Sequence, residues 1–394
     1  MSDNRKDVRS QALDLLRFPL ACVVVTIHVF VGASFVVQGV SYDFTEFWLS
    51  RELIVFAQSF LAGQSVPIYF FIAGYVFFLG INLDMSTYSR KMRNRFKSLF
   101  IPYISWNLLA SLMALLPFLP VLSGFFPGLV GKSPDFHLAN ILNMFWDESH
   151  GILPWNEEAI KAREGHGIIP VDGPLWFVRD LMIVGVTSPL INILLKRGGK
   201  LLPVISGIAW FCLPEASLGH GYQLITAYFF FSLGAYLSFH KRDMVTEFKR
   251  MRMSSFVAYP LVATFLFGYI YFGHREEDLM EFGFTGWLIY VKNLAVLAGL
   301  PFAYNLAVLM IERWHVHSSH ILSSAAFFIY AGHWLFFQNI EKVLMIIIKP
   351  MSNLSVGAVL FLTVLTTVLG LLGLYMAMRR FTPRLLGFFT GGRL

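Results

Sequence analysis

Long apolar stretches separated by short polar segments make up most of the chain. A helix of about 20 apolar residues crosses the hydrocarbon core of a bilayer, because a helix satisfies its own backbone polar groups. The pattern therefore predicts an all-α integral membrane protein with about ten transmembrane helices. Their approximate limits are Leu13–Val37, Leu53–Leu79, Leu99–Leu122, Pro174–Leu195, Leu201–Leu213, Tyr222–Phe239, Phe256–Phe272, Trp287–Ile311, Ile321–Ile340 and Ser355–Met378.

Two apolar segments fit this pattern less well. The fifth stretch, Leu201–Leu213, is short for a span. The segment Val343–Ile348 is too short to cross the bilayer and is followed by Pro350. We therefore expect Val343–Ile348 to lie at the membrane interface.

The composition excludes the main classes of soluble protein. Hydrophobic residues make up 56% of the chain and charged residues only 14%, whereas soluble domains have about 45–50% and about 25%. The two cysteines, Cys22 and Cys212, both lie in apolar runs. A secreted domain held together by disulfides is therefore not expected.

The basic residues predict the orientation of the spans, because Lys and Arg accumulate on the cytoplasmic side. With the N-terminus inside, most of the 31 Lys and Arg residues fall in cytoplasmic segments. Both termini are then cytoplasmic, with residues 1–378 as one membrane domain and residues 379–394 as a basic cytoplasmic or interfacial tail. This asymmetry and the attraction to anionic headgroups explain the net charge of +7 without a nucleic-acid partner.

The largest outer segment, residues 123–173, is too long for an ordinary connection, so we expect it to be functional or partly helical. Acidic groups beside tryptophans suit a neutral, hydroxyl-rich ligand such as a sugar. A solvated loop with tryptophans at the interface explains the same residues equally well. The residues concerned are Asp135, Asp147, Glu148, Glu157, Glu158, Glu164, Asp172, Trp146, Trp155, His137, His150 and His166, with Glu276, Glu277, Asp278 and Glu281 in a second outer loop.

The first span carries Asp14, Arg17 and His28, and ionisable residues within a span are functional candidates. Arg17 and His28 are 11 residues apart, which is about 1,100° of helix and a rise of about 16 Å, so both project from one face. Asp14 lies one turn below Arg17 and can pair with it. Such a stripe suits a site in which the arginine binds an anionic donor and the histidine transfers a proton. A simple helix-to-helix hydrogen bond from His28 is the alternative.

Arg17 and His28, with ten residues between them, resemble the R-x10-H signature of the acyltransferase-3 family of membrane acyltransferases. Further segments resemble the family's motifs in the same order, and the resemblance covers about residues 11–378. These segments are Val66–Phe78, Arg93–Trp106, Gly173–Phe177, Phe229–Leu237 and Phe327–Leu335. One departure is that Arg95 is followed three residues later by Ser98, where relatives often have a second arginine.

The resemblance implies an enzyme of the bacterial cytoplasmic membrane that transfers an acyl group, commonly acetyl, from cytoplasmic acyl-CoA. The acceptor would be a hydroxyl of a glycan or glycolipid. His28 would be the general base, since the ordinary pKa of histidine lies near working pH. The acyl-CoA-binding residues implied are Arg17, its partner Asp14, and the basic turn with Arg90, Arg93 and Arg95. Candidates for the cavity wall or the acceptor are Trp176, Arg179, Tyr330 and His333.

Acyl-CoA is expected as a co-substrate, with no tightly bound cofactor and no metal site. The family's C-terminal esterase-like domain is not expected, because the chain ends soon after the last span. A transporter or flippase of glycans or acylated glycans is the main alternative, since a polar path through the membrane would leave a similar pattern. A base placed above an arginine favours the enzyme.

Overall fold

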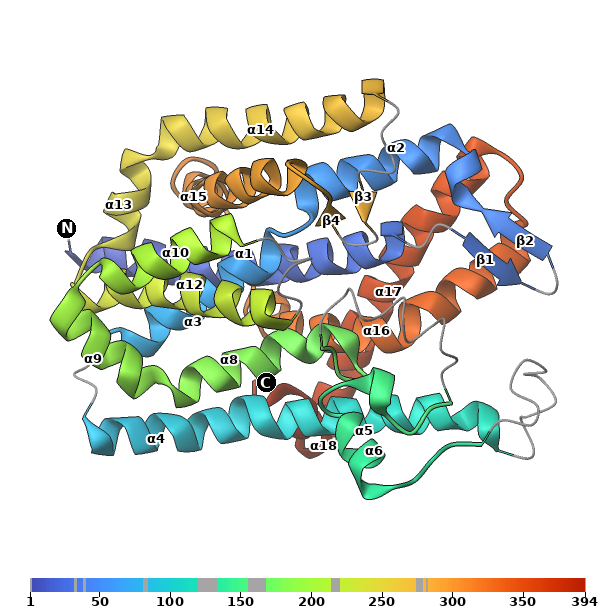
Figure 1. Cartoon of the computed structure of the whole chain (residues 1–394), viewed down its shortest axis with the longest axis horizontal. Helices are drawn as coiled ribbons and strands as arrows, with labels where there is room; N and C mark the ends of the chain where they lie inside the picture. The colour runs from blue at the N-terminus through green and yellow to red at the C-terminus, as the bar shows by residue number, and fades with distance from the viewer. Residues whose placement is uncertain are drawn as a thin grey trace. The chain divides into compact units, whose positions relative to one another are not determined.

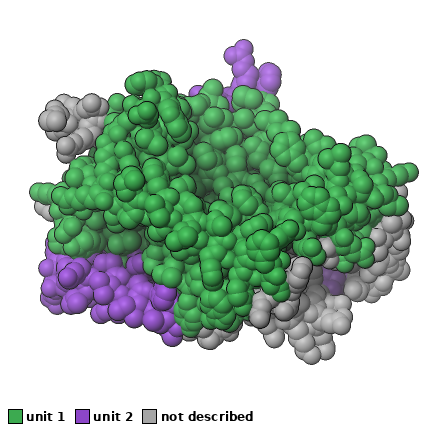
Figure 2. All heavy atoms as spheres, turned by 90° about the horizontal axis from the view of Figure 1, so that it is seen from above, with its two compact units in different colours: residues 1–81, 230–377 green, residues 82–229, 378–394 purple. Residues whose placement is uncertain are grey.

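The computed structural model describes residues 2–31, 34–37, 40–80, 84–119, 133–154, 168–213, 220–273, 279–280 and 283–393. Within these ranges the chain is almost entirely helical (Figure 1). It divides into two compact units (Figure 2), of which unit 1 contains residues 1–81 and 230–377 and unit 2 contains residues 82–229 and 378–394. Parts of both outer acidic loops, residues 155–167, 274–278 and 281–282, lie outside the described residues.

Unit 1 contains most of the long helices and both β-hairpins. Helix α12 begins in unit 2 and continues into unit 1 from residue 230. The hairpins pair β1 (Ser34–Val37) with β2 (Val40–Asp43), and β3 (Leu279–Met280) with β4 (Gly283–Phe284). The helices are α1 (Ser2–Val31), η1 (Phe44–Glu46), α2 (Trp48–Phe56), the π-helical turn η2 (Ala57–Leu61), α3 (Ser65–Phe78), α12 (His220–Phe239), α13 (Met244–Arg250), α14 (Arg252–Gly273), α15 (Leu288–Trp314), α16 (His320–Ile348) and α17 (Asn353–Phe381).

Unit 2 is built around the third and fourth predicted spans. Its elements are α4 (Met85–Arg95), the π-helical turn η3 (Phe96–Phe100), α5 (Ile101–Leu115), η4 (Leu116–Phe118), α6 (Leu138–Asn143), η7 (Glu148–His150), η8 (Gly173–Leu175), α8 (Trp176–Val186), α9 (Ser188–Gly198), α10 (Leu201–Cys212) and α18 (Pro383–Thr390). The described part of the large outer loop is therefore partly helical, as the length of that loop suggested.

Seven helical segments among the described residues are long and apolar enough to cross a membrane. The predicted fourth span is a bent pair, because α8 and α9 meet at an angle of 59° next to Pro189. Two further predicted spans correspond to shorter apolar helices, Leu201–Cys212 and Gln223–Phe239. All ten predicted stretches are thus helical over most of their length, and the protein is a multi-pass membrane protein.

The structure differs from the predicted elements at three segments. Helix α1 ends at Val31 rather than Val37, because the β-branched residues that follow pair as strand β1 in a hairpin. The segment Val343–Ile348 is the last part of α16, which ends only at Lys349 in the left-handed conformation before Pro350. The basic segment with Arg90, Arg93 and Arg95 is helical rather than a turn, since Asp84 caps α4 by accepting a hydrogen bond from the Thr87 amide. The two hairpins are also small departures from an all-α fold.

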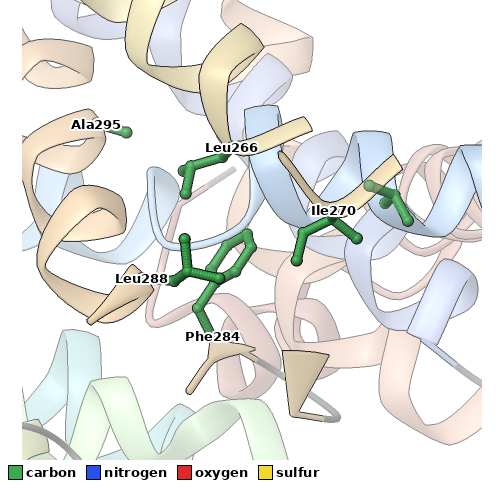
Figure 3. Packing of buried hydrophobic residues seen from close by; sticks show 6 residues of the cluster. Leu266, Ile270, Phe284, Leu288 and Ala295 are labelled. Carbon is green, nitrogen blue, oxygen red and sulfur yellow. The ribbon is translucent and has the colours of Figure 1, made fainter. Parts of the chain in front are cut away.

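The hydrophobic core of unit 1 joins the second span to the pair α14 and α15. Leu266 and Ile270 of α14 pack against Phe284 of β4 and Leu288 of α15, as Figure 3 shows. Elsewhere along this pair, the rings of Tyr259 of α14 and Phe302 of α15 pack together with their centroids 4.6 Å apart.

Two glycines allow the backbones of α3 and α12 to touch. A Cβ atom on Gly74 would lie 2.0 Å from the Phe231 carbonyl oxygen, and one on Gly234 would lie 2.0 Å from the Phe71 carbonyl oxygen. Small residues of this kind let membrane helices pack at close range. The second predicted span, which includes α3, therefore packs against α12 through a backbone contact that a larger residue at either glycine would disturb.

We expect Gly74→Ala to lower the melting temperature of the protein. The added methyl group meets backbone atoms that cannot move aside, and overpacking of this kind costs about 1–3 kcal/mol. Gly370→Ala is the matched control, because nothing lies within 4 Å of a Cβ built at Gly370 of α17. A Gly74→Ala protein that melts with the wild type would contradict the close packing of α3 and α12.

Candidate active site

Helices α1 and α16 lie side by side in unit 1 and run in the same direction. Arg17 contacts Ser323 and His28 contacts His333, and the sequence separations are 306 and 305 residues. A nearly constant separation along two helices means that they are parallel. The first and the ninth predicted spans are expected to be parallel, because both would leave the cytoplasm.

The end of this interface nearer the N-terminus of α1 carries an ion pair. Arg17 Nη1 lies 3.0 Å from Asp14 Oδ1 and donates a hydrogen bond of 3.3 Å to Ser323 Oγ. Ser323 Oγ in turn lies 3.5 Å from Asp14 Oδ1. The Tyr69 hydroxyl donates to the Arg17 carbonyl at 2.8 Å. The Arg17 and Asp14 side chains remain 44% and 38% exposed, so the guanidinium is held in place and is still accessible to an anion.

About three turns further along α1, His28 and His333 form a pair across the interface. His333 Nε2 lies 3.4 Å from His28 Nδ1, and the ring centroids are 5.1 Å apart. His28 Nδ1 also lies 2.8 Å from the Val24 carbonyl oxygen, and His333 Nδ1 lies 2.5 Å from the Tyr330 carbonyl oxygen. His333 is completely buried, whereas His28 is partly exposed.

These contacts assign the protons on both imidazoles. A carbonyl oxygen can only accept a hydrogen bond, so each Nδ1 carries the proton in the neutral ring. His28 Nε2 is then the unprotonated nitrogen and has the lone pair that a general base needs. His333 Nε2 is likewise an acceptor and faces the Nδ1–H group of His28. The contact with His333 therefore involves Nδ1 of His28, and the lone pair of the neutral ring belongs to Nε2.

Aromatic rings surround the histidine pair. Trp334 contacts the His28 ring edge-on at 5.4 Å, and Phe337 stacks with His333 at 6.2 Å. Tyr330 lies between His333 and Tyr69, with centroid distances of 6.2 and 6.3 Å. The surroundings of the imidazoles are therefore largely apolar, which strengthens electrostatic interactions between them.

The structure brings together the sequence-predicted residues Asp14, Arg17, His28, Tyr330 and His333 in unit 1. Ser323, Tyr69 and Trp334 join them and were not among the predicted site residues. Ser323 precedes His333 by ten residues, much as Arg17 precedes His28, but a serine in a helix carries no distinctive signal. The remaining predicted residues, Arg90, Arg93, Arg95, Trp176 and Arg179, belong to unit 2.

Unit 2 contains a cavity of about 690 Å³ between α4–α5, α8 and the outer loop. Arg95 and Arg179 both line it, with a wall of aromatic and aliphatic side chains. Arg95 lies against α8, where its Cδ would be 3.6 Å from a Cβ on Gly185. Arg90 and Arg93 are exposed and do not line the cavity. Among the three arginines of α4, only Arg95 therefore lines this cavity.

Arg179 holds the outer loop against α8. Its Nε donates to Asp180 Oδ1 at 2.9 Å, and its Nη1 donates to the carbonyl oxygens of Trp146 and Ile168 at 3.1 and 3.0 Å. The guanidinium also lies 4.9 Å from the centre of the Trp146 ring. Arg179 thus has a structural role besides lining the cavity, whereas Trp176 is partly exposed and does not line it.

A buried carboxyl group lies at the start of the fourth span. Asp172 is completely buried, and its amide donates to Asn107 Oδ1 at 3.1 Å. Neither carboxyl oxygen has a hydrogen-bond partner among the described residues. Burial, together with the nearby Glu148 carboxylate, raises the pKa of Asp172 well above 3.8. Asp172 is therefore neutral over a wider range of pH than an exposed aspartate.

We expect Asp172 to make the folded protein less stable as pH rises. Its pKa is higher in the folded protein than in the unfolded chain, so the folded state binds more protons between the two values. This contribution to stability is complete below the unfolded pKa and is lost as pH rises through the folded one. Asp172→Asn should flatten the decline of the melting temperature from acidic to neutral pH. Asp135→Asn, at a 60% exposed side chain, should not, and equal slopes in all three proteins would contradict the assignment.

Comparison with known proteins identifies the family of the chain. A family model described as an acyltransferase domain matches residues 10–375. The chain is also 27% identical over 228 residues to the succinoglycan biosynthesis protein ExoH of Rhizobium meliloti (strain 1021), a match that covers 57% of this chain and 56% of that protein. No solved structure matches the chain. Since the family model spans both Arg17 and His28 and nearly the whole chain, the protein belongs to the acyltransferase-3 family.

Proposed function

We propose that the protein transfers an acyl group, acetyl in the first instance, from cytoplasmic acyl-CoA to a hydroxyl of a cell-surface glycan or glycolipid. It would act in the bacterial cytoplasmic membrane. The observation that carries the proposal is the pairing of His28 with His333, about 16 Å along the same helix interface from the Asp14–Arg17 ion pair. A base and an anion site at that spacing suit a substrate that has its charge at one end and its reactive group at the other.

Acyl-CoA is a substrate of this kind, because its phosphates and its thioester lie at opposite ends of a long, thin arm. The Arg17 guanidinium would bind phosphate oxygens through charge-assisted hydrogen bonds. Asp14 and Ser323 keep the guanidinium in place at that end of the interface. The thioester would then lie beside His28, where the rings of Trp334 and Tyr330 line the approach.

The transfer itself needs one proton to move twice. His28 Nε2 takes the proton of the acceptor hydroxyl while the oxygen of that hydroxyl attacks the thioester carbonyl. The carbon–sulfur bond then breaks, the ester remains on the acceptor, and the CoA sulfur leaves with the proton from His28. While His28 is charged, its Nδ1–H is held by the Val24 carbonyl and by His333 Nε2. His333 thus acts as a positioning residue that stabilises the charged ring.

We also propose, from the family resemblance, that an arginine of α4 contacts the donor. Of the three, Arg95 is the best candidate, because it lines the cavity of unit 2 while Arg90 and Arg93 are exposed.

The relative in Rhizobium meliloti supports a polysaccharide as the acceptor. Its name assigns that protein to the biosynthesis of succinoglycan. The match spans 56% of its length, and we propose by analogy that this chain modifies a sugar hydroxyl during the synthesis of a surface polysaccharide.

His28→Ala should abolish transfer in purified protein in lipid nanodiscs supplied with radiolabelled acetyl-CoA and a panel of glycans and glycolipids. A general base contributes about 10²–10⁴ to the rate, and we expect a loss in this range with unchanged donor binding. His320→Ala, at an exposed histidine at the start of α16, is the matched control. Substantial transfer by His28→Ala would remove His28 as the base, and glycan movement without any donor binding would favour a transporter.

Arg17→Gln should raise the KM for acyl-CoA while leaving kcat nearly unchanged. Loss of a charge-assisted hydrogen bond costs about 1.5–3 kcal/mol, which is about 10- to 150-fold in affinity. Arg313→Gln removes an exposed arginine at the end of α15 and should leave the KM as it is. An equal KM in all three proteins would exclude Arg17 from the donor site.

A further inference from the structure

The basic tail, residues 379–394, is packed against α5 within unit 2. Its helix α18 lies beside α5 (Figure 1). The Trp106 indole donates a hydrogen bond of 2.9 Å to the Phe389 carbonyl oxygen, and the two rings pack with their centroids 4.9 Å apart. Trp106 is buried, and Leu386 of α18 is completely buried. Burial and hydrogen bonding therefore hold the tail at a defined place in unit 2.

After α18 the chain passes close to the π-helical turn η3. Gly391 has a φ of +65°, and a Cβ atom built on it would lie 2.5 Å from the Cα of Ser98 in η3. Arg393 Nη2 donates to the Ser98 carbonyl oxygen at 3.5 Å. Single π-helical turns inside helices are frequent at functional sites. The backbone contact at Gly391 thus brings the Arg393 guanidinium to η3.

Arg95 lies at the same turn. It is the residue that caps the start of η3, three positions before Ser98. The charges of Arg95 and Arg393 act directly on each other, and both side chains are partly exposed. Two neighbouring cations repel each other, and an anion placed between them relieves that repulsion. Arg95 and Arg393 therefore form a positively charged pair that an anion can reach.

The position of this pair coincides with the departure from the family pattern. Ser98 stands where relatives often have a second arginine. Here a guanidinium reaches Ser98 from the tail instead. Arg393 lies beyond residues 10–375, which the family model matches. The second cation of this turn is therefore a feature of this chain.

We propose that Arg95 and Arg393 together bind a phosphate monoester, and that in the reaction it is the 3′-phosphate of acyl-CoA. A phosphate monoester carries a charge of about −1.5 to −2 and three acceptor oxygens. The planar fork of an arginine matches such a group with paired hydrogen bonds. The inference rests on the proposed function, which supplies the donor, and deepens it by assigning a donor-binding residue to the tail.

The first test compares CoA with dephospho-CoA, which lacks the 3′-phosphate, on full-length protein in phosphatidylcholine nanodiscs. Wild type should bind CoA more tightly. Arg393→Gln should weaken CoA binding by about tenfold or more and leave the Kd of dephospho-CoA unchanged. Arg393→Lys keeps the charge without the fork and should be intermediate. Arg384→Gln, at an exposed arginine of α18, is the matched control. An unchanged preference for CoA in Arg393→Gln would overturn the proposal.

The second test moves the tail without removing a charge. Gly391→Ala places a methyl group against the backbone of Ser98 and should reduce the preference for CoA. Gly392→Ala is the matched control, because Gly392 also has a positive φ, +81°, and nothing lies within 4 Å of a Cβ built there. Equal preferences in the two variants would contradict the placement of Arg393 by this contact.

Stability and lipid composition separate the site from two other roles. Removing one of two repelling cations should leave the melting temperature unchanged or higher. A lower melting temperature of Arg393→Gln, with equal loss of CoA and dephospho-CoA binding, would make Arg393 structural and overturn the proposal. Phosphatidic acid in the nanodiscs offers the same monoester on a lipid. A site whose binding of phosphatidic acid, but not of CoA, depends on Arg393 would belong to the lipid and exclude the donor.

The outcomes also distinguish this proposal from the proposed function. Acyl transfer by wild type and Arg393→Gln with equal KM for acetyl-CoA would leave the enzyme intact and exclude the site. A preference for CoA that depends on Arg393 without any transfer would retain the site and exclude the acyltransferase. A wild-type protein that neither binds CoA nor transfers acetyl would exclude both.

Discussion

Water is absent from the hydrocarbon core, so polar groups placed there must find partners within the protein. The interface between α1 and α16 is organised by this constraint. Asp14, Arg17 and Ser323 satisfy one another at its end nearer the N-terminus of α1. His28 and His333 each satisfy a ring nitrogen with a backbone carbonyl one turn earlier on their own helix. These polar side chains are tolerated between α1 and α16 because each helix supplies hydrogen-bond partners in place of water.

The same arrangement shows how a backbone carbonyl can orient a histidine. In many hydrolases an acidic side chain fixes the tautomer of the catalytic histidine. Here the Val24 carbonyl fixes the Nδ1–H of His28 at 2.8 Å. A neutral orienting group avoids placing a second full charge in an apolar region. A neutral group also stabilises a protonated imidazole less strongly than a carboxylate does.

The spans and the polar stripe of α1 were predictable because they are local. Hydrophobic periodicity located the long helices, and the 11-residue spacing placed Arg17 and His28 on one face. The strand after Val31 was not predictable from apolarity, since β-branched residues in a hairpin look like the end of a span. Ser323 and Trp334 could not be identified, because their significance depends on which helix lies beside α16. That pairing joins residues about 305 positions apart, and no local pattern contains it.

The parallel pairing of α1 and α16 also determines when the site is complete during synthesis. The first helix enters the membrane with Asp14, Arg17 and His28, and its partner is made only after some 300 further residues. At about 5–20 residues per second, this interval is on the order of tens of seconds. Throughout it, the charged face of α1 lacks the serine and the histidine that it contacts in the finished protein. The nascent first helix therefore needs another polar environment, and the insertion machinery or the other early helices must shelter it until α16 arrives.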